Sequence, residues 1–124
     1  DCDVIDADGG TRTAGITGAY VALRECEARM EAEGLLLKPL LNDGVAAVSC
    51  GIVEGEPLLD LAYSEDSRAE ADLNVVFSHS GGLIEVQGTG EKRPISPDEF
   101  AALMEFATAG ARQIQEIQKA ALGL

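Results

Sequence analysis

Two long stretches of the chain carry apolar residues at the three- and four-residue spacing of an amphipathic helix. The first begins near Thr11 or Thr13 and ends before Gly34, a residue type that commonly terminates helices because it adopts the left-handed conformation easily. Its apolar stripe is formed by Ile16, Ala19, Tyr20, Leu23, Cys26 and Met30. The spacing therefore predicts a helix with one buried face.

The second helical stretch has the clearest start signal in the chain. Ser96 is followed by Pro97 and then, three residues after Ser96, by Glu99, which is the pattern of a capping box. The stripe behind this start runs to near the end of the chain through Phe100, Leu103, Met104, Ala107, Ala111, Ile114, Ile117 and Ala121. We expect a helix that packs along most of its length.

The remaining apolar runs are short and are typical of β-strands. They predict strands at residues 2–7, 45–53, 58–63, 73–78 and 83–88, and the nearly continuous run at 45–53 favours a strand buried on both faces. The resulting order, β-α-β-β-β-β-α, predicts an α+β fold. We expect a mostly antiparallel, mixed sheet with both helices on one face, in a single domain formed by residues 1–124.

Composition and charge limit the possible functions. Hydrophobic residues make up 46% of the 124 positions, so we expect a buried core. The three cysteines are far apart and form no zinc or disulfide pattern, and no apolar run is long enough to cross a membrane, which together favour the cytoplasm. The formal charge of −13 repels nucleic acid, so RNA binding would need positive charge from elsewhere.

The segment from Asp8 to Thr13 is a candidate anion site. Gly9 and Gly10 leave the backbone open to close approach, and the helix that follows would direct its unpaired N–H groups toward the same point as Arg12. This arrangement suits a phosphate. Paired glycines before a threonine also form ordinary strand-to-helix turns, and spacing alone favours that alternative.

A second candidate lies in the acidic stretch that contains Asp66 and Asp72. Six residues separate them, so their carboxylates point apart on a helix and lie about 20 Å apart on a straight strand. They meet only if residues 67–71 form a bend, in which case they could hold magnesium or one could act as a general acid. A solvated acidic turn is the alternative that spacing alone favours. His79, the only histidine, is expected to be an exposed turn residue.

Several blocks, in order over nearly the whole chain, resemble ribonuclease PH. They are Asp1–Val4, Ala7–Thr13, Ile16–Ala19, Ala46–Ser49, Gly51–Val53, Pro57–Leu61, Glu65–Ser67, Asp72–Val76 and Ile84–Thr89. The resemblance implies a ribonuclease PH-like, two-layer, ribosomal-protein-like fold. It also implies a phosphorolytic 3′-to-5′ exoribonuclease, a tRNA nucleotidyltransferase that trims tRNA precursors with inorganic phosphate as the attacking group.

The same resemblance implies roles for particular residues. Gly10, Thr11 and Arg12 would bind phosphate, and Asp66 and Asp72 would be the catalytic acids and the ligands of Mg²⁺. The implied partners are the 3′ ends of tRNA and further copies of the chain, in a hexameric ring of dimers, with neither a membrane nor DNA among them.

Two positions depart from the family pattern. Asp6 stands where glutamine is common, and Ala62 stands where an aspartate is common, so the organisation of a metal could be weaker.

Members of this family are longer, and the chain starts abruptly at Asp1, so we expect it to be the C-terminal half of such an enzyme. Alone it should have little or no nuclease activity, because the other half supplies a further phosphate-binding arginine and much of the positive surface. The alternative is a non-catalytic ring-assembly or RNA-binding module of an exosome-like complex. The presence of Arg12, Asp66 and Asp72 favours the enzyme.

Overall fold

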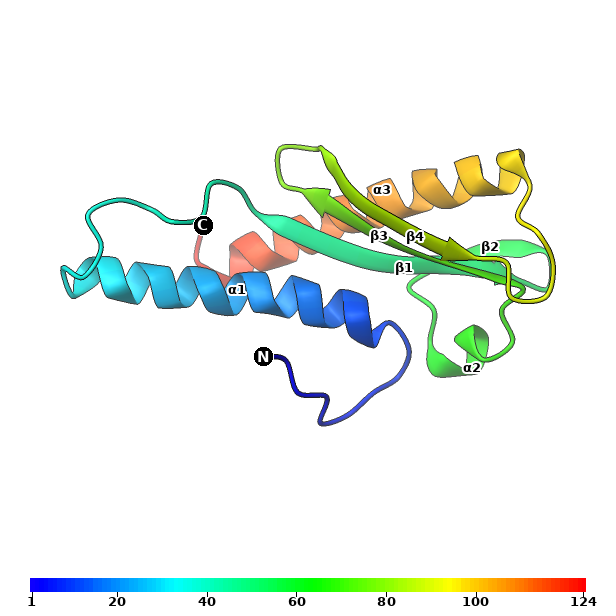
Figure 1. Cartoon of the computed structure of the whole chain (residues 1–124), viewed down its shortest axis with the longest axis horizontal. Helices are drawn as coiled ribbons and strands as arrows, with labels where there is room; N and C mark the ends of the chain where they lie inside the picture. The colour runs from blue at the N-terminus through cyan, green and yellow to red at the C-terminus, as the bar shows by residue number, and fades with distance from the viewer.

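The computed structural model describes all 124 residues, in the order α-β-β-α-β-β-α (Figure 1). The elements are α1 (Thr11–Ala32), β1 (Val45–Val53), β2 (Glu56–Leu59), α2 (Tyr63–Asp66), β3 (Ala71–Ser78), β4 (Leu83–Thr89) and α3 (Pro97–Ala121). The four strands form one antiparallel sheet in the order β2-β1-β3-β4. The predicted α+β class and both long helices are confirmed. None of the helices has the length and apolar character that crossing a membrane requires.

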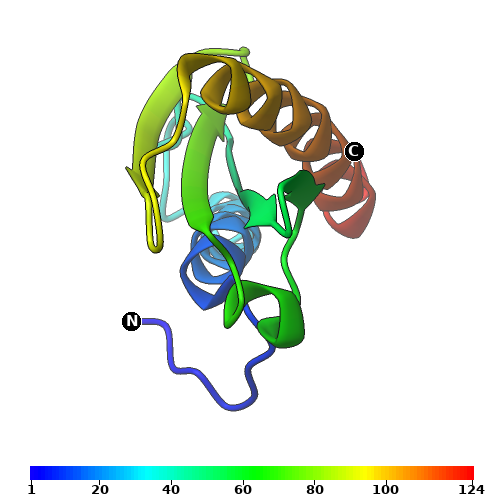
Figure 2. The same cartoon turned by 90° about the vertical axis from the view of Figure 1, so that its right-hand side faces the viewer.

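One face of the sheet is buried against α3. Leu103, Ala107 and Ala111 lie four residues apart on this helix and are at most 2% exposed. They pack on alternate residues of β1 and β3, namely Val48, Cys50, Ile52, Ala71, Leu73, Val75 and Phe77. Figure 2 shows α3 crossing the sheet on this side. The predicted stripe of the second helix is therefore the main source of the core.

The first helix lies along the edge of β1 rather than beside α3 on the same face. β2 pairs only with residues 50–53 of β1, which leaves the backbone of Ala47 unpaired on that side. Thr17 pairs with both the N–H and the C=O group of Ala47, because its Oγ1 lies 3.1 Å from the backbone nitrogen and 3.1 Å from the backbone oxygen of that residue. The predicted position of α1 is corrected accordingly: this helix covers an edge that no strand occupies.

The strand predicted at residues 2–7 does not form, and this expectation is corrected. An extended segment becomes a strand only when a neighbour pairs with its N–H and C=O groups. In this fold α1 occupies the free part of the β1 edge, and residues 1–8 stay exposed outside the sheet, looping past the start of α1 (Figure 1).

The return strand of the hairpin is also shorter than predicted. It ends at Leu59 because Asp60 takes a positive φ of 56° and turns the chain toward α2.

His79 is half-buried, not the exposed turn residue that was expected. Its ring packs edge-on against Tyr20 with 4.9 Å between the ring centroids, and its Nε2 lies 2.8 Å from Oε1 of Gln118. Gly44 permits this position, because a side chain there would collide with the imidazole ring. Gln118 also donates to the carbonyl of Thr17 at 2.9 Å. The histidine therefore helps to join α1, the sheet and α3.

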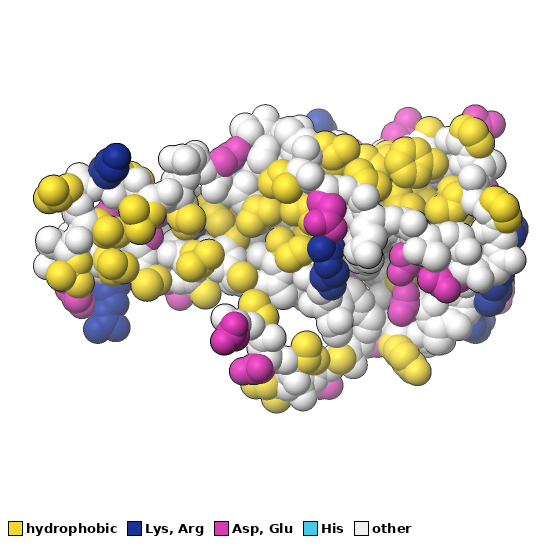
Figure 3. All heavy atoms as spheres, in the orientation of Figure 1, with side chains coloured by type: hydrophobic (Ala, Val, Ile, Leu, Met, Phe, Trp, Pro, Cys, Tyr) yellow, Lys and Arg dark blue, Asp and Glu magenta, His cyan; other side chains and the backbone are white.

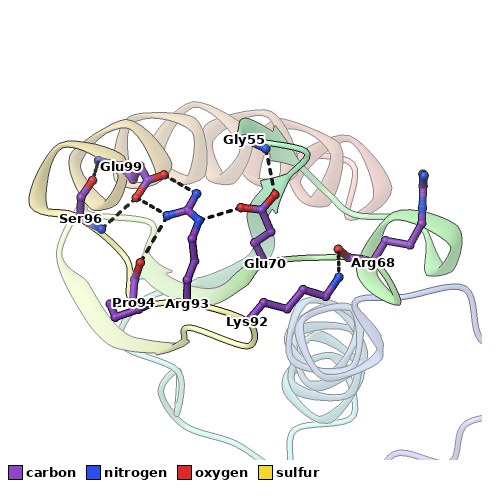
Figure 4. A network of polar contacts seen from close by, with 8 residues as sticks. All are labelled: Gly55, Arg68, Glu70, Lys92, Arg93, Pro94, Ser96 and Glu99. Atoms are coloured by element: carbon purple, nitrogen blue, oxygen red, sulfur yellow. Dashed lines mark hydrogen bonds and ion pairs between the residues drawn. The ribbon is translucent and has the colours of Figure 1, made fainter.

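Helix α3 begins at Ser96 with the predicted capping box. The Ser96 hydroxyl accepts from the N–H of Glu99 at 3.2 Å, and the Glu99 carboxylate accepts from the N–H of Ser96 at 2.9 Å. Arg93 adds two hydrogen bonds to the same carboxylate, at 2.7 and 3.1 Å (Figure 4). The bonds from Arg93, and then those from Ser96, lower the pKa of Glu99 to about 2.

We expect this carboxylate to make the stability of the fold dependent on acidic pH. The pKa of Glu99 falls from 4.5 to about 2 on folding, so its ionised form favours the folded state. That contribution is complete above pH 4.5 and is lost as the pH falls toward 2. Glu99→Gln should therefore lower the midpoint of urea unfolding near neutral pH. The difference in midpoint between the variant and wild type should shrink as the pH falls from 4.5 toward 2.

The matched control is Glu105→Gln, at an exposed glutamate of the same helix for which no hydrogen bond or ion pair is found. Its difference from wild type should stay small at every pH. If the urea midpoint of Glu99→Gln differed from that of wild type by the same amount at every pH, the ionised carboxylate of Glu99 would not be what stabilises the fold.

Candidate functional site

Gly9 and Gly10 form the turn that leads into α1. Their φ angles are 73° and 56°, in the left-handed region that side chains disfavour. A side chain on Gly9 would collide with the carbonyl oxygen of Leu61, and a Cβ on Gly10 would lie 3.2 Å from the hydroxyl of Ser49. The paired glycines therefore allow the start of α1 to pack directly on the sheet and on the segment that precedes α2.

Thr11 and Arg12 lie in the first turn of α1, where backbone N–H groups have no helical partner. No side chain caps this end of the helix: the hydroxyl of Thr13 donates to the carbonyl of Gly10, at 2.9 Å. Arg12 extends to Glu85 of β4, with 2.8 Å between Nη2 and Oε1, and both side chains are about half exposed. Together, the N–H groups, the helix dipole and the guanidinium suit a phosphate.

Ser49 lies beneath this turn and has an unpaired hydroxyl. The residue is 8% exposed, and its Oγ is buried without a hydrogen-bond partner. An unpaired buried polar group costs about 1–3 kcal/mol, and in a binding site a ligand or water commonly satisfies it. The orphaned hydroxyl thus fits a polar ligand near Gly10. The sequence pattern does not single out Ser49, whose one signal is that it is the only hydroxyl in the apolar run 45–53.

Asp66 and Asp72 face one pocket, as the proposed bend requires. α2 ends at Asp66, and β3 starts at Ala71, so the chain reverses within the few residues between them. The two aspartates line a pocket of about 290 Å³ together with Glu91 and Lys92. Glu91 and Lys92 come from the loop between β4 and α3, and no sequence pattern predicts that this loop lies beside the acids.

Burial and negative neighbours make Asp72 unusual among the acids of the chain. Its pKa is raised first by burial and then by the charges of Asp66 and Glu91. The pKa of the adjacent Cys50 thiol is raised to about 12, mainly by burial, so this cysteine stays protonated. A carboxyl in such surroundings is well suited to hold a proton or to gain from a nearby cation.

The two aspartates fit the way in which proteins usually hold magnesium. One or two carboxylates typically bind this ion, and waters and substrate phosphates supply its other ligands. No group of three or more histidine, cysteine, aspartate or glutamate side chains is close enough to form a metal site alone. Ala62 begins α2 and adds no carboxylate. Asp66 and Asp72 could thus supply two carboxylate ligands, and a metal ion there would need waters or a phosphate for its remaining ligands.

The anion site and the acid pocket lie on the same side of the sheet, opposite α3. Glu85, the partner of Arg12, is paired with Val76, whereas Asp72 is paired with Thr89, four residues further along β4. Because a strand rises about 3.3 Å per residue, these two points are about 13 Å apart. Arg12 and the aspartates thus share a face without direct contact.

One hydrogen bond connects the two regions: the N–H of Tyr63, the first residue of α2, donates to Asp8 at 2.9 Å. Figure 3 shows this side of the molecule, where hydrophobic side chains form a band with acidic ones scattered on both sides of it and few basic ones.

Comparison with known proteins identifies the family. Residues 43–110, more than half of the chain, match the model of the 3′ exoribonuclease family, domain 2. This range contains Asp66 and Asp72 and begins after the segment with Gly10, Thr11 and Arg12.

Curated relatives extend the match to nearly the whole chain. Ribonuclease PH from Methylobacterium nodulans is 54% identical over 123 residues, which cover 99% of this chain and 52% of that protein. Ribonuclease PH from Brucella ovis is also 54% identical, over 98% of this chain and 52% of its own length. The chain therefore spans about half the length of the curated relatives it matches.

Solved structures share the fold at low sequence identity. Rrp46 from rice (Oryza sativa) superposes with a TM-score of 0.74 and 23% identity, over 97% of this chain and 51% of that one. A chain of the Archaeoglobus fulgidus exosome with RNA bound to the active site gives a TM-score of 0.66 and 22% identity, over 90% of this chain and 44% of that one. These likenesses show the fold. The family match at residues 43–110, more than half of the chain, shows that the chain belongs to the 3′ exoribonuclease family.

Proposed function

We propose that the protein containing this chain is a phosphate-dependent 3′-to-5′ exoribonuclease that processes the 3′ ends of tRNA. The chain would form the C-terminal half of its ribonuclease PH domain, as one domain over residues 1–124. The identity of 54% to two ribonuclease PH proteins supports this activity. The observation that carries it is that Asp66 and Asp72 turn into one pocket, on the same face as the anion site at the start of α1.

In this proposal, Gly10, Thr11 and Arg12 bind inorganic phosphate. The N–H groups of the first helical turn and the guanidinium orient one phosphate oxygen toward the last phosphodiester of the RNA. That oxygen attacks the phosphorus, the bond to the 3′ oxygen of the preceding nucleotide breaks, and a nucleoside diphosphate is released.

Asp66 and Asp72 act at the leaving 3′ oxygen. Mg²⁺ held by these carboxylates would offset the negative charge that develops there. The pKa of Asp72 is raised by burial and by Asp66 and Glu91, so this site favours either a cation or a proton. A protonated Asp72 could equally serve as the general acid that the departing oxygen needs.

The negative charge of the chain is easier to reconcile with one part of an RNA-binding enzyme than with a complete one. Its formal charge is −13, and Arg12 is already paired with Glu85. Positive surface for RNA would therefore come from other parts of the protein or from other subunits. We infer a cytoplasmic homo-oligomer, a hexameric ring of dimers, in which the isolated chain has little or no activity.

The second candidate function is a non-catalytic assembly or RNA-binding module of an exosome-like complex. Its support is the fold shared with rice Rrp46 and with the exosome chain, at identities of 23% and 22%. The enzyme is the better-supported candidate, because the two aspartates and the glycine turn are all in place. The two functions predict different results when the acid pocket is altered: the enzyme would lose phosphorolysis, whereas a non-catalytic module has no such activity to lose.

We expect Asp72→Asn in the intact protein to reduce phosphorolysis on the order of 100-fold or more, because the pocket loses a charge that acts in the transition state. The measurement is the rate of nucleoside diphosphate release from RNA with phosphate and Mg²⁺. Asp98→Asn, at the start of α3 and outside the acid pocket, is the matched control and should leave the rate unchanged. Full activity of Asp72→Asn would rule out the catalytic assignment.

Arg12→Gln should instead weaken phosphate binding. Loss of one or two charged hydrogen bonds should raise the KM for inorganic phosphate about 10- to 100-fold, with a smaller effect on kcat at saturating phosphate. Arg29→Gln removes an equal charge at an exposed ion pair near the end of α1 and serves as the control. An unchanged KM for phosphate in Arg12→Gln would show that the start of α1 is not the phosphate site.

A further inference from the structure

Arg93 joins the loop beside the acid pocket to two other parts of the fold. We propose that Arg93 is a positioning residue that binds Glu70 and Glu99 at once and so holds the bend between Asp66 and Asp72 in its working shape. The inference rests on the proposed function, because it concerns the same two aspartates. It adds a residue that neither the family match nor the sequence pattern singles out.

The guanidinium of Arg93 uses two of its edges. Its Nε donates to Glu70 at 2.7 Å, and its two terminal nitrogens donate to the two oxygens of Glu99 at 2.7 and 3.1 Å (Figure 4). Both glutamate side chains are 25% exposed, and that of Arg93 is 39% exposed. Arginine suits this position because its planar fork can bind two carboxylates in fixed directions, which the single ammonium of lysine cannot.

Glu70 connects Arg93 to the backbone between the two aspartates. It lies two residues before Asp72 and four after Asp66, and every polar group of this residue is engaged. Its N–H donates to the carbonyl of Ile52 at 2.7 Å, and its own carbonyl accepts from the backbone N–H of Lys92 at 3.0 Å. Its second carboxylate oxygen accepts from the N–H of Gly55 at 3.1 Å. Movement of Glu70 would therefore move the backbone on which both aspartates stand.

Glu99 provides the fixed end of the bridge. It belongs to the capping box of α3, and the same helix enters the core four residues later with Leu103, which is fully buried. Arg93 thus links the bend to the most firmly packed helix of the fold. Its neighbours Glu91 and Lys92 line the acid pocket, so the same contact also holds one wall of that pocket.

The charges nearby favour a structural bridge over an anion-binding surface. Arg93 is paired with two glutamates, and Arg68 is paired with Glu54 at 3.1 Å. Lys92 is directed to the carbonyl of Arg68, at 2.6 Å. The positive groups of this cluster are thus already engaged by partners within the chain, and Figure 4 shows those of Lys92 and Arg93. The bonds between Glu99 and Ser96 that cap α3 do not involve Arg93, so we expect loss of Arg93 to act mainly on the bend.

The experiment compares Arg93→Ala, Arg93→Lys and the distant control Arg29→Ala in the intact protein. In Arg93→Ala, amide hydrogen exchange should accelerate in residues 66–73, and kcat should fall roughly 10- to 100-fold, as expected for misplaced catalytic groups. The KM for phosphate should stay within about twofold, because the hydrogen bonds of Arg93 go to Glu70, Pro94 and Glu99 and none goes to the anion site. Arg93→Lys should restore only part of the loss, and Arg29→Ala should match wild type.

Glu70→Gln tests the bridge from its other end and guards against misfolding of the arginine variant. It should also accelerate exchange in residues 66–73, and the double variant with Arg93→Ala should be little worse than either single change. Unchanged exchange or an unchanged kcat in Arg93→Ala would overturn the proposal, as would additive effects in the double variant. If Asp72→Asn keeps full activity, the proposed function fails, whereas the exchange measurement still reports on the bridge.

Discussion

The packing of α3 against β1 and β3 is the interaction on which the rest of the structure depends. Leu103, Ala107 and Ala111 bury one face of the sheet almost completely, and each large apolar side chain removed from water contributes about 1.5–3 kcal/mol. Because residues alternate along a strand, this burial directs Asp72 and Val76 to the opposite face. The core therefore determines which side of the sheet can carry the polar site.

On that opposite side, the candidate site is built from the ends of elements rather than from their middles. The start of α1, the end of α2 and the start of β3 each leave polar groups free, and the fold brings these ends to one face. The contact between Gly9 and the backbone at Leu61 makes this possible, since no side chain stands between the two segments. Loops and element ends are where binding groups concentrate in many folds, because their backbone groups are not all used by secondary structure.

Charge gives the site its particular character. Most of the few cations are paired within the chain, as Arg12 is with Glu85 and Arg93 is with Glu70 and Glu99. Lys92, the one cation that lines the acid pocket, donates to the carbonyl of Arg68, and the pKa of Asp72 is raised by burial and by its acidic neighbours. Such a pocket favours a cation, and an RNA substrate would need positive surface beyond this chain, which spans about half the length of its curated relatives.

Local pattern in the sequence was enough for the two long helices, the Ser96 capping box and the α+β class, because helical spacing and caps depend on residues close together in the chain. It was also enough to show that Asp66 and Asp72 could meet only through a bend. Tertiary structure decided the place of α1, the exposed course of residues 2–7, the half-buried position of His79 and the bridge from Arg93 to Glu70. Each of these depends on a partner distant in sequence, and a strand or an ion pair forms only when the fold delivers that partner within bonding distance.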